Sequence, residues 1–144
     1  MLHSLSIQRY FSLPDEAKQI RISVFVNEQG FKEEFDTIDN ICTHYVLYFD
    51  EKPVATARLF YNKEHRCYCV GRFAILKGYR RLGLGKKLME YIEQEAKTIN
   101  NASLIGVSAQ QRAIPFYKAC GYKETDSHYL DESYPHVWMI KKLN

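Results

Sequence analysis

Hydrophobic residues recur along the chain with two periods, one typical of strands and one typical of helices. Near the start, Leu5 and Ile7 alternate with polar residues, which predicts a short strand. A helix is predicted to follow, with Ser12 as its N-cap and Pro14 in its first turn. The apolar positions behind this start have helical spacing: Ala17, Ile20 and Val24.

Three β-rich segments come next, at residues 44–49, 54–61 and 66–75. Only short turns separate them, so we expect the three to be antiparallel neighbours in one sheet. Gly71, inside the third segment, predicts a β-bulge at that point.

The period changes to that of a helix after residue 83. Five apolar residues mark one face of a helix of about four turns: Leu84, Leu88, Tyr91, Ile92 and Ile99. Asn100 and Asn101 are predicted to end this helix, and residues 104–107 predict a short buried strand.

A second helical segment and two strands complete the pattern. The helix is predicted from the spacing of Ala113, Phe116, Tyr117 and Cys120. Gly121 suits the position after its last turn, and the strands are expected near residues 122–129 and 137–142. This order predicts one domain over residues 1–144, of the α+β (α/β) class, with helices around one mixed sheet.

Composition restricts the location and the partners of the protein. The 144 residues are 46% hydrophobic and 26% charged, as in an ordinary globular domain. No apolar stretch is long enough for a membrane helix, and the start lacks a signal-peptide pattern, so we expect a cytoplasmic protein without a membrane partner. The net charge of +3 is too small to indicate nucleic-acid binding.

The cysteines and most histidines show no metal-binding pattern. Cys67-x-Cys69 fits no common metal knuckle, and in a strand both side chains would share one face. Free thiols in a reducing cytoplasm are expected, with zinc or disulfides as the alternative. Four histidines lack metal spacing and are interpreted as structural or exposed, so no metal is expected: His3, His44, His65 and His128.

The segment at residues 80–87 combines two features that each cost free energy at a helix start. Gly83 and Gly85 lie in the opening turn, where a helical glycine costs about 1 kcal/mol relative to alanine. Cations also crowd the positive end of the helix dipole, where they are disfavoured. They are Arg80, Arg81, Lys86 and Lys87. A bound anion, held by backbone N–H groups and neutralised by these side chains, would explain both features.

Two common nucleotide-binding loops do not fit this segment. A Walker loop needs Gly-x-x-x-x-Gly-Lys-Ser/Thr, and a dinucleotide loop needs a third glycine where this chain has Leu88. A solvated helix start with incidental glycines is the alternative to an anion site.

The same segment resembles a known family. Arg80-x-x-Gly83-x-Gly85 matches the Gln/Arg-x-x-Gly-x-Gly/Ala pattern of the GNAT superfamily of N-acetyltransferases. Residues 71–75 resemble the family's central strand, and residues 113–122 resemble its later Phe-Tyr-x-x-x-Gly-Phe segment. Residues 21–29 resemble a branch of uncharacterised bacterial members, so the resemblance covers nearly the whole chain.

The resemblance implies a mostly antiparallel mixed sheet whose central fourth and fifth strands splay apart. Acetyl coenzyme A is then the expected co-substrate, with pantetheine between the splayed strands and pyrophosphate at the glycine-rich turn. The residues expected to contact it are Phe73, Ala74, Ile75, Arg80, Arg81, Leu82, Gly83, Leu84, Gly85, Lys86 and Gln110.

The resemblance also implies catalytic roles. Tyr117 matches the tyrosine that protonates the coenzyme A thiolate, and the alternative is that it only packs. A backbone N–H near Ile75 is expected to polarise the thioester carbonyl. His136 has a pKa range that suits proton shuttling, or it is a structural or surface histidine.

The general base is less directly implied. Many relatives carry a strand glutamate for this role, but residues 104–108 contain no carboxylate. Glu28 is predicted instead, with Glu33, Glu34 and Asp36 of the same acidic segment as substitutes. This segment would also attract a cationic amine, or it is simply a solvated acidic loop.

The predicted function is transfer of the acetyl group of acetyl coenzyme A to a primary amine, by direct attack in a ternary complex. A non-catalytic acyl coenzyme A sensor is the main alternative, and a nucleic-acid binder would show steep salt dependence. Relatives often dimerise, so a homodimer is an option. Residues 28–39 and 128–136 do not select among acceptor amines.

Overall fold

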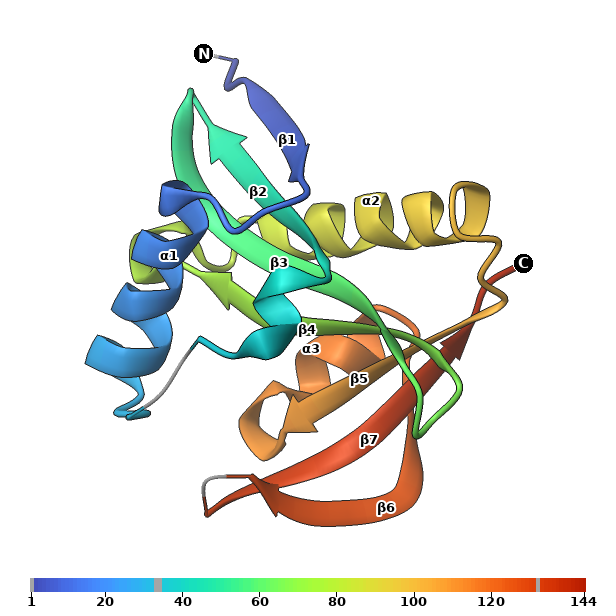
Figure 1. Cartoon of the computed structure of the whole chain (residues 1–144). Helices are drawn as coiled ribbons and strands as arrows, with labels where there is room; N and C mark the ends of the chain where they lie inside the picture. Colours follow the sequence, from blue (N-terminus) through green and yellow to red (C-terminus); the bar gives the residue numbers. More distant parts are fainter. Residues whose placement is uncertain (1, 33–34, 132) are drawn as a thin grey trace.

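The centre of the protein is a twisted seven-stranded sheet. The computed structural model describes residues 2–32, 35–131 and 133–144. The strands are β1 (Leu5–Tyr10), β2 (Thr43–Phe49), β3 (Lys52–Asn62), β4 (Cys67–Ile75), β5 (Leu104–Gln110), β6 (Lys123–Asp131) and β7 (Tyr134–Lys142). Their order across the sheet is β1-β2-β3-β4-β5-β7-β6 (Figure 1). All neighbours are antiparallel except the parallel pair β4 and β5, which confirms the predicted mixed, mostly antiparallel sheet.

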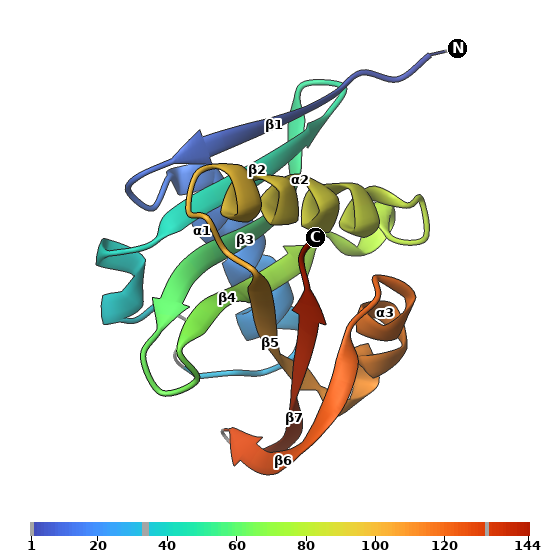
Figure 2. The ribbon, with the colours of Figure 1, turned by 90° about the vertical axis from the view of Figure 1, so that its right-hand side faces the viewer.

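Helices cover both faces of this sheet. They are α1 (Asp15–Arg21), which continues as a π-helical segment (Ile22–Glu28), α2 (Leu84–Thr98) and α3 (Ile114–Ala119). Figure 2 shows α2 in front of the sheet and α1 behind it. The predicted N-cap Ser12 is wrong, because α1 begins one residue after an extended Pro14, which occupies the cap without a side-chain hydrogen bond. Three short 3₁₀ turns lie at Thr37–Asn40, Lys77–Tyr79 and Gln111–Ala113.

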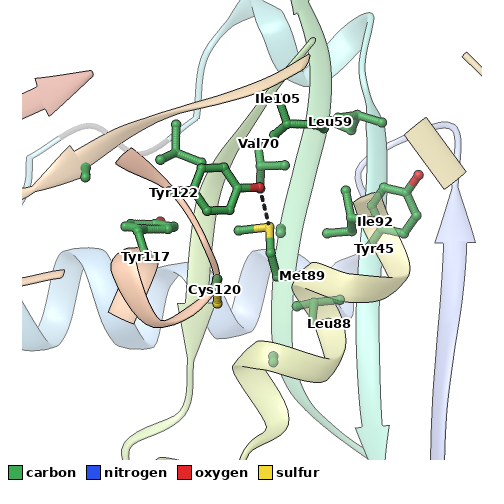
Figure 3. Packing of buried hydrophobic residues seen from close by; sticks show 14 of the residues in the cluster. Tyr45, Leu59, Val70, Leu88, Met89, Ile92, Ile105, Tyr117, Cys120 and Tyr122 are labelled. Carbon is green, nitrogen blue, oxygen red and sulfur yellow. Dashed lines mark hydrogen bonds between the residues drawn. The ribbon is translucent and has the colours of Figure 1, made fainter. Parts of the chain in front are cut away.

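Two hydrophobic cores lie on opposite faces of the sheet. The smaller one joins α1 to the sheet through Ala17, Ile20 and Val24, as the helical spacing predicts. The larger one joins α2 and α3 to the other face (Figure 3). Tyr91 and Ile99, predicted on its buried helix face, are instead 37% and 59% exposed. The side chains that α2 buries are Leu84, Leu88, Met89, Ile92, Glu93 and Ala96.

The two central strands separate after a short stretch of pairing. Parallel pairing runs only from Tyr68 with Ile105 to Val70 with Val107, while both strands continue beyond it. In Figure 1 the carboxyl ends of β4 and β5 point apart. This opening exposes backbone groups of β4 that an intact sheet would pair.

A bulge in β4 lies beside this opening. Thr56 of β3 pairs with Ala74, but Arg58 pairs with Gly71, so β4 holds one residue more than β3 over this interval. The left-handed backbone of Arg72, with φ of 47°, marks the bulge. The bulge predicted at Gly71 is therefore displaced by one residue.

The remaining sequence features are placed as follows. All four cysteines are free and buried, and Cys67 and Cys69 pack together against Trp138. Gly121 follows α3 with φ of 97°, as predicted for the residue after a helix. Among the described residues, no helix has the length and apolar character needed to cross a bilayer.

Candidate active site

A large cavity occupies the opening between β4 and β5. Its volume is ≈ 630 Å³, within the usual range for small-molecule sites. Its walls come from β4, β5, the turn before α2, the α3 region, the π-helical segment and the β6–β7 hairpin. Segments far apart in the sequence therefore meet at one site.

Most of the predicted cofactor contacts lie in the wall of this cavity. They are Phe73, Ala74, Ile75, Arg80, Arg81, Gly83, Leu84, Gly85, Lys86 and Gln110, and Tyr117 lines it too. Leu82 is the exception, because its side chain is 55% exposed and lies outside the wall. Its predicted contact would have to come from its backbone.

The turn before α2 has the geometry of an anion site. Arg81 and Gly83 have left-handed backbones, with φ of 64° and 77°. Gly83 is the N-cap and offers no side chain, so no side-chain bond caps the first-turn N–H groups of this 15-residue helix. Lys86 lines the cavity beside them. Backbone donors, the helix dipole and two cations thus converge where the sequence places a phosphate.

Glu28 does not lie in the cavity wall. Its carboxylate receives two hydrogen bonds from Arg80, of 2.6 and 2.7 Å, while Nε of Arg80 donates to the Ile75 carbonyl at 2.9 Å. Hydrogen bonding from Arg80 lowers the pKa of Glu28 below its ordinary value, which makes it a weaker base. Two of the alternative bases, Glu33 and Glu34, lie outside the described residues.

Tyr117 lies between the larger core and the cavity. Its ring packs edge-on against Tyr122, with centroids 5.9 Å apart (Figure 3). Burial raises its pKa, so the phenol keeps its proton near neutral pH. The Tyr117 hydroxyl is not among the fully buried side-chain nitrogens and oxygens that lack a hydrogen-bond partner. In the described chain, Nε of Arg58 is the one such atom.

Arginines neutralise the acidic segment. Arg58 binds Asp36 through two bonds of 2.6 and 3.0 Å and binds Asp39 at 2.9 Å. Arg21 also binds Asp39, at 2.8 and 3.0 Å, and Arg72 reaches Asp36 at 3.2 Å. The described carboxylates of this segment are therefore neither a free acidic rim nor a solvated loop. They attach residues 36–39 to β3 and β4.

Asp39, Cys42 and His44 offer three potential metal ligands within 4.8 Å of one another. Each already has protein contacts: Arg21 and Arg58 hold the Asp39 carboxylate, and Nε2 of His44 donates to the Asp39 carbonyl at 2.9 Å. Burial raises the pKa of the Cys42 thiol to about 11, which opposes the thiolate that a metal needs. These contacts account for the closeness of the three residues without a bound ion. The expectation that the protein binds no metal stays a prediction.

The part of the cavity wall near Gln29 was less visible in the sequence. Gln29 accepts hydrogen bonds from Gln110 at 3.1 Å and from the Tyr134 hydroxyl at 3.2 Å. The Tyr134 ring packs 4.9 Å from Phe31. His136, expected as a proton shuttle or as a structural or surface histidine, lines the wall. These residues have no motif of their own, because only the fold brings their distant segments together.

Other wall residues differ in whether the sequence could have revealed them. Arg58 interrupts the apolar run at 54–61, and a charge inside a buried strand is a usable signal. Asp131 lies in a polar, exposed strand and offers none. It is the one carboxylate among the described residues that line the cavity.

Comparisons with known proteins identify the family of the chain. The family model described as "Acetyltransferase (GNAT) family" matches residues 7–122. The uncharacterized N-acetyltransferase YjcF of Bacillus subtilis (strain 168) is 35% identical over 129 residues, covering 88% of this chain and 90% of its own.

Solved structures share the fold. One, described as a "putative N-acetyltransferase from Lactobacillus plantarum", superposes with a TM-score of 0.87 at 31% identity, covering 98% of this chain and 99% of that one. Another, from Bacillus anthracis str. Ames, was solved in complex with acetyl coenzyme A. It has a TM-score of 0.65 at 20% identity and covers 78% of this chain and 70% of that one.

The splayed mixed sheet, the matching family model and the similar acetyltransferases together define a protein of the acyltransferase class. The chain belongs to the GNAT family of acetyltransferases.

Proposed function

We propose that the protein transfers the acetyl group of acetyl coenzyme A to a primary amine by direct attack in a ternary complex. The observation that carries the proposal is an uncapped, glycine-rich and cationic helix start in the wall of a cavity that Tyr117 also lines. The structure of the same fold from Bacillus anthracis contains acetyl coenzyme A, which supports this choice of co-substrate.

The residues of the cavity fit such a co-substrate. First-turn N–H groups of α2, with Arg81 and Lys86, would hold the diphosphate. The backbone of β4 from Phe73 to Ile75, which lies beyond the last pair with β5, would hold the pantetheine arm as a neighbouring strand would. Acetyl coenzyme A supplies the activated thioester.

The protein then contributes positioning, polarisation and a proton. The Ile75 region points backbone donors toward the carbonyl oxygen of the thioester. Tyr117, protonated because burial raises its pKa, gives its proton to the departing sulfur. Holding both substrates in one cavity supplies much of the acceleration.

A covalent intermediate on a cysteine is disfavoured. Cys69 lines the cavity, but burial raises its pKa to about 12, so it remains a weakly nucleophilic thiol. Direct attack by the amine needs no such residue.

Glu28 has a positioning role in this proposal. It holds Arg80 against the Ile75 carbonyl, and this fixes the turn relative to the end of β4. The role of Glu28 as general base stays a prediction, and the ion pair with Arg80 argues against it. The cytoplasmic location and the homodimer likewise stay predictions; the four free cysteines fit a reducing compartment.

An acceptor screen tests the proposed function. Polyamines, aminoglycosides, amino acids and short peptides would be incubated with acetyl coenzyme A while free thiol is followed. Thiol release that depends on one class of amine, together with the acetylated product by mass spectrometry, is the expected result. Tight binding of acetyl coenzyme A without transfer to any amine would instead support the non-catalytic sensor.

Replacing Tyr117 with phenylalanine is expected to lower kcat about a hundredfold, because the departing thiolate loses its acid. The affinity for acetyl coenzyme A should stay within a small factor of the original, since the ring and its packing remain. Tyr122→Phe serves as the matched control, because this hydroxyl is buried in the core on Glu93. Equal kcat in the Tyr117 variant and the unaltered protein would remove the acid role.

A further inference from the structure

An acceptor amine arrives as an ammonium ion and must lose a proton before it can attack. The acidic segment was the predicted source of a base, but arginines already bind its described carboxylates. Arg80 binds Glu28, and other arginines bind Asp36 and Asp39. A base that faces the cavity without such a partner has to come from elsewhere in the wall.

His136 meets this requirement. It is 7% exposed, lines the cavity and begins the buried part of β7, opposite Gln110 at the end of β5. Its Nδ1 lies 2.9 Å from the carbonyl oxygen of Tyr134. A carbonyl only accepts, so Nδ1 carries a proton, and the neutral ring keeps its lone pair on Nε2.

The environment of the ring leaves Nε2 available. Nε2 has no hydrogen-bond partner in the described part of the chain. It also does not belong to the fully buried, unpartnered side-chain nitrogens there, so solvent or a substrate can reach it. Tyr129 of β6 stacks on the ring, with centroids 6.0 Å apart and planes at 17°, and thereby fixes its orientation. Tyr129 is itself hydrogen bonded to Ser108 of β5.

Asp131 is the second wall residue that suits an amine acceptor. It ends β6, lines the same cavity and has no ion-pair partner among the described residues. The other charged residues of the wall are cations: Arg58, Arg72, Arg80, Arg81, Lys86 and Arg112. A lone carboxylate in such a wall would attract a cationic group to one end of it.

We propose that the β6–β7 hairpin binds and deprotonates the acceptor amine, with Asp131 attracting the ammonium ion and His136 Nε2 accepting its proton. This inference rests on the proposed acetyl transfer and deepens it. It also restricts the acceptor to amines that are protonated in solution and that present the ammonium group as their leading end.

The protons and bonds balance as follows. His136 takes one proton from the ammonium ion and later releases it to solvent. The amine nitrogen forms its bond to the carbonyl carbon, and the carbon–sulfur bond breaks. Tyr117 gives a proton to the sulfur and recovers one from the nitrogen as the amide forms. The net products are the acetamide, free coenzyme A thiol and one proton.

Several titratable or charged groups contact the His136 ring or share the cavity wall with it. Tyr129 stacks on the ring, and the wall also contains Asp131 of β6, Cys69 and Arg72 of β4, Arg58 of β3 and Arg112 beyond β5. Burial raises the pKa values of Cys69 and Tyr129, so neither ionises near neutral pH.

The test compares His136→Gln with His128→Gln, which replaces an exposed histidine of β6 outside the cavity wall. With the best amine of the screen, we expect His136→Gln to lower kcat/KM about a hundredfold near neutral pH, and His128→Gln to leave it unchanged. The rise of rate with pH should shift in His136→Gln to the range where the amine itself loses its proton. Acetyl coenzyme A affinity and thermal unfolding would show that the variant is folded.

Two further arms separate the outcomes. Methoxyamine, largely neutral near pH 7, needs no base for its first proton, so its rate should be little changed in His136→Gln. Asp131→Asn, an exposed substitution, should raise KM for the ammonium acceptor but not for methoxyamine. If the unaltered protein transfers to an amine and His136→Gln shows the same rate and pH profile, the inference is wrong while the proposed function stands. If the unaltered protein transfers to no amine, the proposed function fails and the inference fails with it.

Discussion

Reversing two charges at the turn before α2, with Arg81→Glu and Lys86→Glu together, is expected to weaken acetyl coenzyme A binding about a thousandfold. Both side chains line the cavity beside the uncapped first turn of α2. A hydrogen bond between charged groups contributes about 1.5–3 kcal/mol, so losing two of them raises the dissociation constant by roughly three powers of ten. Isothermal titration calorimetry at moderate salt would measure the change.

The matched control is Lys97→Glu with Lys123→Glu. Both lysines are exposed and lie outside the cavity wall, so the net charge changes equally while the turn is preserved. This control should bind acetyl coenzyme A nearly as the unaltered protein does. Equal losses in both double variants would show that only the long-range field matters, and unchanged affinity in the first would place the diphosphate elsewhere.

Asp39→Asn is expected to lower the free energy of unfolding by about 3–5 kcal/mol, as for other broken buried ion pairs. Arg21 is 1% exposed and Arg58 is 3% exposed, and both donate to Asp39. Asparagine has the same shape but no charge, so two buried guanidinium groups lose compensation. Urea unfolding would measure the loss, and Asp126→Asn, on the exposed face of β6, should change stability by less than about 0.5 kcal/mol.

The same carboxylate predicts a dependence of stability on pH. Burial alone would raise the pKa of Asp39, but hydrogen bonds from Arg21 and Arg58 outweigh it and lower the value to about 2. A lowered pKa in the folded state stabilises the protein above the unfolded value of about 3.9, and this stabilisation is lost as pH falls toward 2. The unaltered protein should therefore lose stability over this interval more steeply than Asp39→Asn. Parallel profiles would contradict the assignment.

Features set by neighbouring residues were predictable from the sequence. The strands and α2 follow from periods that the chain repeats locally, and the turn that opens α2 follows from two glycines within three residues. Errors occurred where a local pattern had more than one solution. Pro14 took the cap position expected for Ser12. The sheet buries a narrower face of α2 than the apolar spacing predicted, so Tyr91 and Ile99 stay exposed.

The acceptor side could not be predicted, because its contacts join distant segments. Asp39 and Arg58 are 19 positions apart, and nothing local says that the acidic segment folds back onto β3. Gln29 and Tyr134 are 105 positions apart, and they meet only because the β6–β7 hairpin lies beside β5. Sequence patterns therefore placed the base in the acidic segment, whereas the fold brings His136 to the cavity.

A crystal structure of the protein with acetyl coenzyme A would show where this co-substrate binds. We expect the diphosphate on the backbone N–H groups at residues 81–86, the pantetheine along Phe73–Ile75, and the sulfur within reach of the Tyr117 hydroxyl. Acetyl coenzyme A bound outside the opening between β4 and β5, or its absence from crystals grown at saturating concentration, would contradict it.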